Sequence, residues 1–191
     1  MQKLSEKEFR GVVDPYLEKY FNIEREVRSS CGTARLDYVL ENKRTGDLFG
    51  IEAKKNGKLR GEQMGKNLLQ CKRYTSLNWI GNLARHQRVP IFLMPGISEQ
   101  FIQIDKQDDG WCKKIPGEFK LFYRAYHSYY HEHHNLNSII STAFNVGEVK
   151  LEYFNGKKEM YFSFNNKIIW SARYGVHKKN YDFLFKKIIR L

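Results

Sequence analysis

The sequence predicts an α/β fold, and three observations support this prediction. A helical pattern of apolar residues covers residues 5–20. Two apolar runs joined by a short polar turn follow within residues 34–54, as expected for a β-hairpin. A second amphipathic helical pattern over residues 61–76 leads to a short apolar run over 89–94, which is typical of a buried strand. These segments predict a helix, an antiparallel β-hairpin, a second helix and a further buried strand.

The first predicted helix begins with a capping box, because Ser5 is followed three positions later by Glu8. We expect it to extend to about Tyr20. One face carries its apolar residues, which are Phe9, Val12, Val13, Tyr16 and Tyr20. At about 100° per residue, Glu6 lies at the edge of that face.

The strands that follow place three charged residues near one another. A first strand is expected over 23–27, and the polar turn 42–47 joins the next two strands in an antiparallel hairpin. Asp37 and Glu52 then lie on adjacent strands. Glu52 and Lys54 are two positions apart, so on a strand their side chains leave the same face.

The second predicted helix carries two stripes of side chains. The apolar stripe consists of Met64, Leu68 and Cys71, and a polar stripe about a quarter-turn away consists of Gln63, Asn67, Gln70 and Tyr74. The polar stripe is expected to face a functional site.

The C-terminal half is harder to interpret. An aromatic and histidine-rich segment over 119–134 predicts a helix, and a basic amphipathic helix is expected over 181–191. Between them, a three-stranded meander is predicted over 148–153, 160–164 and 168–171. We therefore divide the chain into a core over 1–110 and an aromatic and basic α+β extension over 111–191, which is either separate from the core or integrated with it.

The charge distribution favours an anionic partner. The net charge is +12, and residues 54–73 hold seven basic residues against one acidic residue. Residues 173–191 hold six basic residues against one acidic residue. Such runs can simply be solvated faces, but the first adjoins the acidic residues of the predicted hairpin, where cations bind phosphates. Nucleic acid is therefore the expected partner, with DNA favoured over RNA.

Other features of the composition indicate where the protein resides. The longest apolar run, 89–94, is too short to span a membrane, and the first residues lack the apolar segment of a secretory signal. We expect a cytoplasmic protein without a membrane partner. Cys31, Cys71 and Cys112 are odd in number and widely spaced, so we expect reduced, buried thiols.

The most informative motif combines Asp37, Glu52 and Lys54 with Gln70-x-x-x-Tyr74. A Glu-x-Lys string alone carries little information, because three others occur in the chain, at residues 41–43, 118–120 and 148–150. The string at 52–54 differs in context. It follows an apolar run, has an aspartate on the neighbouring strand and precedes an amphipathic helix.

This combination resembles the PD-(D/E)XK nuclease superfamily, and within it the RecB-type branch that adds a Q-x-x-x-Y motif. The resemblance covers about the first half of the chain, with Leu36 in place of the proline that names the motif. It implies a restriction-endonuclease-like core made of a helix, a mixed central sheet and a second helix, and it implies Mg²⁺-dependent cleavage of DNA. It also suggests Glu6 as the helical acid that some members use as an extra metal ligand.

The residue types support a metal-dependent mechanism. Asp37 and Glu52 carry like charges, so their proximity favours a divalent cation with oxygen ligands, completed by the Ala53 carbonyl and waters. Mg²⁺ or Mn²⁺ fits that ligand set. Lys54 would orient the attacking water or stabilise the transition state.

The substrate would be held by residues that do not take part in bond-making. Gln70 and Tyr74 are expected to position the strand near the cut. Lys58, Arg60 and Lys66 are expected to bind phosphates.

Two other functions remain open at this stage. The chain can be a non-catalytic nucleic-acid-binding protein that uses a nuclease-like scaffold. It can also be a protein-interaction or inhibitor module, with a homodimer or another protein bound through the C-terminal half.

Overall fold

The structure is a computed structural model that describes residues 6–54, 61–94, 142–154 and 157–190. It confirms a mixed α/β fold. Within these residues one mixed sheet of nine strands runs in the order β4-β1-β2-β3-β5-β6-β7-β8-β9. The predicted helix over 119–134 lies outside the described residues.

The strand bounds agree closely with the predicted segments. The strands are β1 (Phe21–Ser29), β2 (Arg35–Asn42), β3 (Leu48–Ala53), β4 (Trp79–Ile80), β5 (Ile91–Met94), β6 (Gly147–Phe154), β7 (Lys157–Phe164), β8 (Lys167–Ser171) and β9 (Gly175–Val176). The hairpin β2-β3 and the meander β6-β7-β8 are antiparallel, as expected. β4 and β9 have two residues each, too few to show a pattern that would predict them.

The sheet joins the two halves of the chain. β5 pairs in parallel with β3 on one side and with β6 on the other, where Phe92 lies opposite Gly147. The predicted boundary between 1–110 and 111–191 falls outside the described residues. On both sides of that gap, however, the strands belong to one sheet, so the described part of the extension continues the core.

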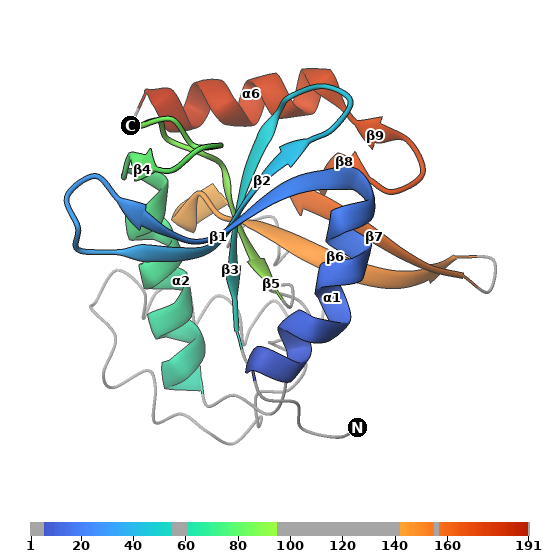
Figure 1. Ribbon diagram of the computed structural model, residues 1–191, viewed down its shortest axis with the longest axis horizontal. Coiled ribbons are helices and arrows are strands. Elements are labelled where there is room, and N and C mark those ends of the chain that lie inside the picture. Colours follow the sequence, from blue (N-terminus) through green and yellow to red (C-terminus); the bar gives the residue numbers. More distant parts are fainter. Residues whose placement is uncertain (1–5, 55–60, 95–141, 155–156, 191) are drawn as a thin grey trace.

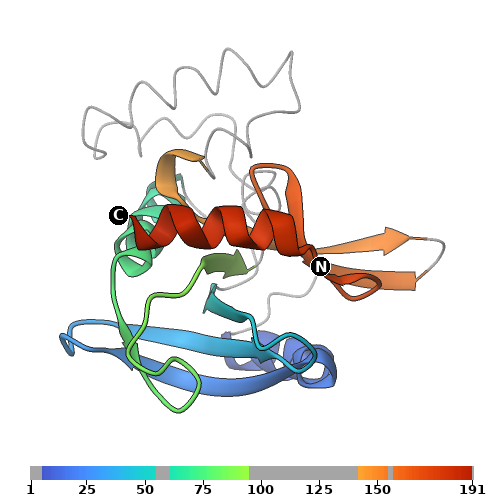
Figure 2. The same ribbon diagram turned by 90° about the horizontal axis from the view of Figure 1, so that it is seen from above.

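In the described part of the chain, three long helices cover the sheet, namely α1 (Glu6–Tyr20), α2 (Gly61–Thr75) and α6 (Lys178–Ile189). Buried residues of α1 and α6 belong to one apolar cluster, and those of α2 belong to another. α1 and α2 accordingly lie on different sides of β3 and β5 (Figure 1; Figure 2). None of the helices in the described residues is long and apolar enough to cross a membrane.

The cluster under α1 and α6 is rich in aromatic rings. Phe21 lies against both Phe162 and Trp170, with ring centroids 5.7 and 4.7 Å apart. Phe49 reaches Phe162 at 5.3 Å. These contacts join β1 and β3 to the C-terminal meander, and burial of such rings supplies a large share of the stabilising free energy.

The buried face of α1 differs from the predicted face. Val13 and Leu17 are buried in the core, whereas Tyr16 is 47% exposed. The prediction that Tyr16 belongs to the buried face is therefore wrong. Val13 and Leu17 are four positions apart and share one face, and the buried stripe follows them, which leaves the tyrosine at the rim.

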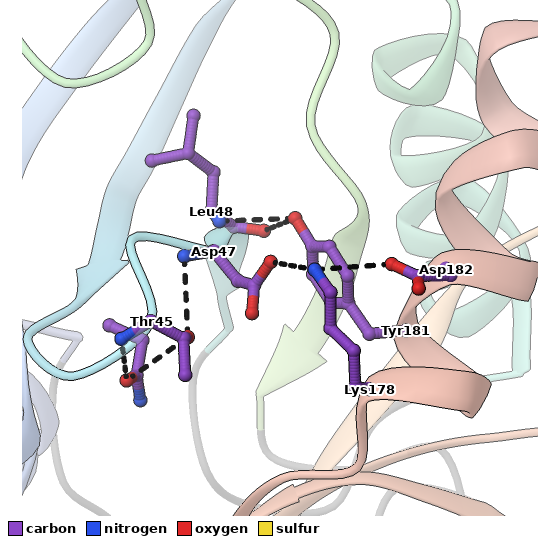
Figure 3. A network of polar contacts seen from close by, with 7 residues as sticks. Thr45, Asp47, Leu48, Lys178, Tyr181 and Asp182 are labelled. Carbon is purple, nitrogen blue, oxygen red and sulfur yellow. Dashed lines mark hydrogen bonds and ion pairs between the residues drawn. The ribbon is translucent and has the colours of Figure 1, made fainter.

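A polar network attaches α6 to the β2-β3 hairpin (Figure 3). The Tyr181 hydroxyl accepts a hydrogen bond from the Leu48 amide at 3.1 Å and donates to the Leu48 carbonyl at 3.0 Å. Lys178 forms ion pairs with Asp47 at 2.8 Å and with Asp182 at 3.2 Å. Burial, followed by the Asp47 charge, raises the pKa of Tyr181, so its hydroxyl keeps the proton that it donates.

Candidate functional site

Glu52 and Lys54 lie at the carboxyl end of β3. Glu52 is 4% exposed, and the Lys54 ammonium donates to its Oε1 at 2.5 Å. Strand alternation directs both side chains to one face, as the sequence predicts. The backbone amide of Lys54 donates to the Met94 carbonyl of β5, which fixes the chain at the point where β3 ends.

Asp37 joins this group from the neighbouring strand. Its Oδ2 accepts a hydrogen bond from the Ala53 amide at 2.7 Å. In the β2-β3 register Tyr38 lies opposite Ile51, so Asp37 and Glu52 are the next residues along each strand. The two carboxylates therefore lie on adjacent strands, as expected.

Helix α2 brings Gln70 and Tyr74 to the same group. The Gln70 amide nitrogen donates to Glu52 Oε1 at 2.8 Å, and its oxygen accepts from Lys54 at 2.9 Å. The same nitrogen also donates to the Tyr74 hydroxyl at 2.7 Å, which in turn donates to the Arg35 carbonyl at 3.2 Å. Since residues four apart share a helix face, the Q-x-x-x-Y spacing allows this chain of contacts.

The electrostatic balance keeps Lys54 charged. Burial alone lowers the pKa of Lys54, but the Coulombic attraction and hydrogen bond of Glu52 outweigh it, so the net pKa is raised above the ordinary lysine value. The ammonium therefore persists at neutral pH. Burial raises the pKa of the Cys71 thiol beneath this group, so Cys71 is no nucleophile.

The remaining predicted site residues have separate outcomes. Lys66 is exposed on α2. Lys58 and Arg60 lie outside the described residues, and so does the side chain of Glu6, the first residue of α1. The structure therefore brings together Asp37, Glu52, Lys54, Gln70 and Tyr74, while the predicted roles of all these residues stay predictions.

The oxygen atoms of this group are of the type that hard divalent cations prefer as ligands. Asp37 and Glu52 are oxygen ligands, and the Ala53 carbonyl between Glu52 and Lys54 is a third candidate. Mg²⁺ is commonly bound through one or two carboxylates, with waters and substrate phosphates completing its shell. Across the described ranges no group of three or more His, Cys, Asp or Glu side chains is arranged to hold a metal, so a sparse set of this kind is what the site offers.

A second Glu-x-Lys string, discounted in the sequence analysis, belongs to the same sheet. Glu148 on β6 is 1% exposed, and its Oε1 lies 3.0 Å from the Lys150 ammonium. Ser163 on β7 approaches the same oxygen at 3.4 Å. The sequence does contain a signal for this pair, because Glu148 and Lys150 flank the apolar residue Val149 within a predicted strand. It was missed because the string alone has no specificity.

The cysteines only partly agree with expectation. Cys71 is buried, but Cys31 is exposed, so the prediction that it is buried is wrong. Its position explains this, because Cys31 lies in the turn after β1. The hydrogen bond with Ser29, followed by that with Thr33, lowers the pKa of the Cys31 thiol to about 7. Cys112 lies outside the described residues.

Comparisons with known proteins identify no relative: no protein-family model, curated protein or solved structure matches the chain.

Proposed function

We propose that the chain is a metal-dependent nuclease that hydrolyses phosphodiester bonds, with DNA as the substrate. The supporting observation is the hydrogen-bonded group at the end of β3, where Glu52, Lys54 and Gln70 contact one another and Asp37 is bound to the adjoining Ala53 amide. Two carboxylates and an ammonium that lie together on adjacent strands are the groups that such hydrolysis requires.

In this proposal Asp37 and Glu52 would hold Mg²⁺ or Mn²⁺ together with the Ala53 carbonyl. When bound, the metal lowers the pKa of a water molecule and offsets charge on the phosphate. A carboxylate pair without a cation is electrostatically unfavourable. Lys54 offsets part of this repulsion through its contact with Glu52.

Lys54 would act on the reacting phosphate. Its ammonium is charged at neutral pH and lies beside the carboxylates, so it is placed to orient the attacking water or to stabilise negative charge that develops in the transition state. Its side chain is mostly buried, which strengthens such an interaction relative to water.

Gln70 and Tyr74 are better described as positioning residues than as substrate contacts. Gln70 binds both Glu52 and Lys54, and Tyr74 orients the Gln70 amide while it is itself attached to the β2 backbone. The pair holds the ionic groups at a defined distance, and small displacements of such groups are costly for catalysis.

The decisive experiment is a cleavage assay. Supercoiled plasmid, linear duplex and single strand are incubated with the protein, with Mg²⁺ or with chelator. The parent protein should cleave in the presence of Mg²⁺ and not in the presence of chelator. The Glu52→Gln substitution should remove nearly all of this cleavage. Glu41→Gln is the matched control, because Glu41 belongs to another Glu-x-Lys string on the neighbouring strand β2 and lies outside the site. If Glu52→Gln protein cuts as well as the parent, the proposal is wrong.

Binding provides an independent test of the basic run. Neutralising three of its residues should lower the slope of log affinity against log salt for duplex DNA by about three units, roughly one per lost phosphate contact. The three residues are Lys58, Arg60 and Lys66. The matched control neutralises Lys179, Lys186 and Arg190 in the C-terminal run, and a smaller change is expected there. An unchanged slope in the first variant would favour the protein-interaction alternative.

A further inference from the structure

The register of the sheet extends the candidate site toward the C-terminal meander. Glu52 lies opposite Leu93, Leu93 lies opposite Glu148, and Glu148 lies opposite Ser163. Residues directly opposite one another on paired strands project from the same face. Glu148 and Ser163 therefore share the face of Glu52, and Glu148 lies two strand spacings, about 10 Å, from it.

The two Glu-x-Lys pairs have the same orientation along the sheet. β3 and β6 are both parallel to β5, so each pair has its lysine two residues beyond its glutamate in the same direction. The Glu148 and Lys150 side chains expose only 2% and 16% of their surface. Burying an ion pair costs desolvation free energy.

A cavity of about 400 Å³ opens on this face beside Lys150. Lys150 lies opposite Tyr161, which lies opposite Ser171, and all three line the cavity. Arg173 and Tyr174, which are both exposed, also line the cavity. The Arg173 guanidinium lies over the Tyr174 ring at 5.2 Å, and Tyr174 is 67% exposed.

The cavity combines the groups that bind an unpaired nucleotide. Lys150 and Arg173 offer charge for phosphates, and an exposed tyrosine ring offers a surface on which a base of any identity can stack. Glu159, which also lines the cavity, adds an acceptor for an exocyclic amino group. A base in a duplex is already stacked and paired, so it cannot enter such a cavity without leaving the helix.

We propose that this cavity binds an unpaired nucleotide of a single-stranded nucleic-acid segment. The phosphate contacts Lys150 and Arg173, and the base stacks on Tyr174. This inference deepens the proposed function and rests on it for nucleic acid as the substrate. It assigns the protein a substrate with a single-stranded part, such as a free end or a flap.

The test measures binding without cleavage. Fluorescence anisotropy of a labelled short oligothymidylate, in chelator, gives the affinity of the parent and of two variants with changes at exposed positions. Tyr174→Ala should weaken single-strand binding about 5- to 150-fold, which corresponds to the loss of one stacked base. Arg173→Gln should lower the salt slope for single strand by about 0.7.

Matched controls separate the cavity from general surface effects. Ile80→Ala removes an exposed apolar side chain from β4, at the opposite end of the sheet from β8 and β9, and Arg44→Gln removes an exposed arginine from the β2-β3 turn. Both should bind single strand as the parent does. Blunt duplex, measured in parallel, should be affected little by Tyr174→Ala.

The outcomes distinguish this inference from the proposed function. Parent-like single-strand affinity in Tyr174→Ala and Arg173→Gln overturns the inference, whatever the cleavage assay shows. Equal losses for duplex and single strand also overturn it, because the cavity would then not discriminate unpaired bases. If both variants lose single-strand binding while Glu52→Gln still cuts DNA, the cavity is supported and the proposed active site is wrong.

Discussion

We predict that the Glu52–Lys54 ion pair is needed for cleavage but adds little net free energy to folding. Comparing single and double variants of the pair tests this prediction. Glu52→Gln removes the negative charge with little change of shape and leaves the Lys54 ammonium in a largely buried position. Removing one partner of a buried pair typically costs 3–5 kcal/mol, because the other charge is left uncompensated. Replacing both partners by uncharged residues of similar size is often neutral or stabilising.

The structure sets the expected magnitude. The Glu52 and Lys54 side chains are 5% and 15% exposed, so little solvent compensates a lost partner. In Glu52→Gln, however, Lys54 still donates to the Gln70 oxygen. We therefore expect the lower end of the range, about 3 kcal/mol for Glu52→Gln, or roughly 6–12 °C in melting temperature for a chain of this size. Lys54→Met should cost at least as much, because it leaves two neighbouring carboxylates.

The double variant Glu52→Gln, Lys54→Met is the informative one. Its free energy of unfolding should lie within about 1 kcal/mol of the parent value, far from the sum of the two single changes. Cleavage should be lost in all three variants. Urea unfolding followed by the fluorescence of the buried Trp79 and Trp170 gives the stabilities, and plasmid nicking gives the activities.

An exposed pair provides the control. Glu18→Gln breaks the contact of Glu18 with Arg25, whose side chains are 59% and 44% exposed, and should cost less than about 1 kcal/mol. The reasoning is refuted if the double variant is destabilised by the sum of the single effects, since the two charges would then not be coupled. It is also refuted if Glu52→Gln costs no more than Glu18→Gln.

Three further predictions address the rest of the molecule. Tyr181→Phe leaves the Leu48 amide and carbonyl without their buried partner and should lower the free energy of unfolding by about 1–3 kcal/mol in urea titration, with cleavage unchanged well below the melting temperature. Gly147→Ala would place a methyl group against the Phe92 ring and 2.9 Å from a β7 carbonyl oxygen, so it should destabilise the β5-β6 junction by about 1–3 kcal/mol in the same assay. The thiolate is the reactive form of cysteine, so the iodoacetamide reaction of Cys31 should accelerate as the pH rises through about 7; a midpoint at the ordinary thiol value of about 8.5 would contradict this.

Local chemistry was sufficient to predict much of the candidate site. The period of two along a strand places Glu52 and Lys54 on one face, and the spacing of four along a helix aligns Gln70 with Tyr74. A short polar turn makes the strands of Asp37 and Glu52 neighbours. Each of these relations is set within a few residues or a single hairpin, so the sequence alone contains the information.

The same local rules leave other features undetermined. They did not specify which polar partner the helix would meet, and Gln70 proves to bind Glu52 and Lys54 directly. Local periodicity placed Tyr16 on the buried face of α1, whereas the structure buries Val13 and Leu17 and leaves Tyr16 exposed. Packing against β1 and the C-terminal meander decides which face is buried.

What only the tertiary structure decided involves residues that are far apart in the chain. The parallel pairing of β5 with both β3 and β6 places Glu148 in line with Glu52 across the sheet, although the two residues are 96 positions apart in the sequence. The contact of Tyr181 with Leu48 spans 133 positions. No local periodicity encodes such pairings, because they depend on which of several competing apolar surfaces meet when the whole core is buried. The sequence by itself determined which chemical groups are present and to which face of a strand or helix each side chain points. The burial of a shared core determined which of these groups lie close together.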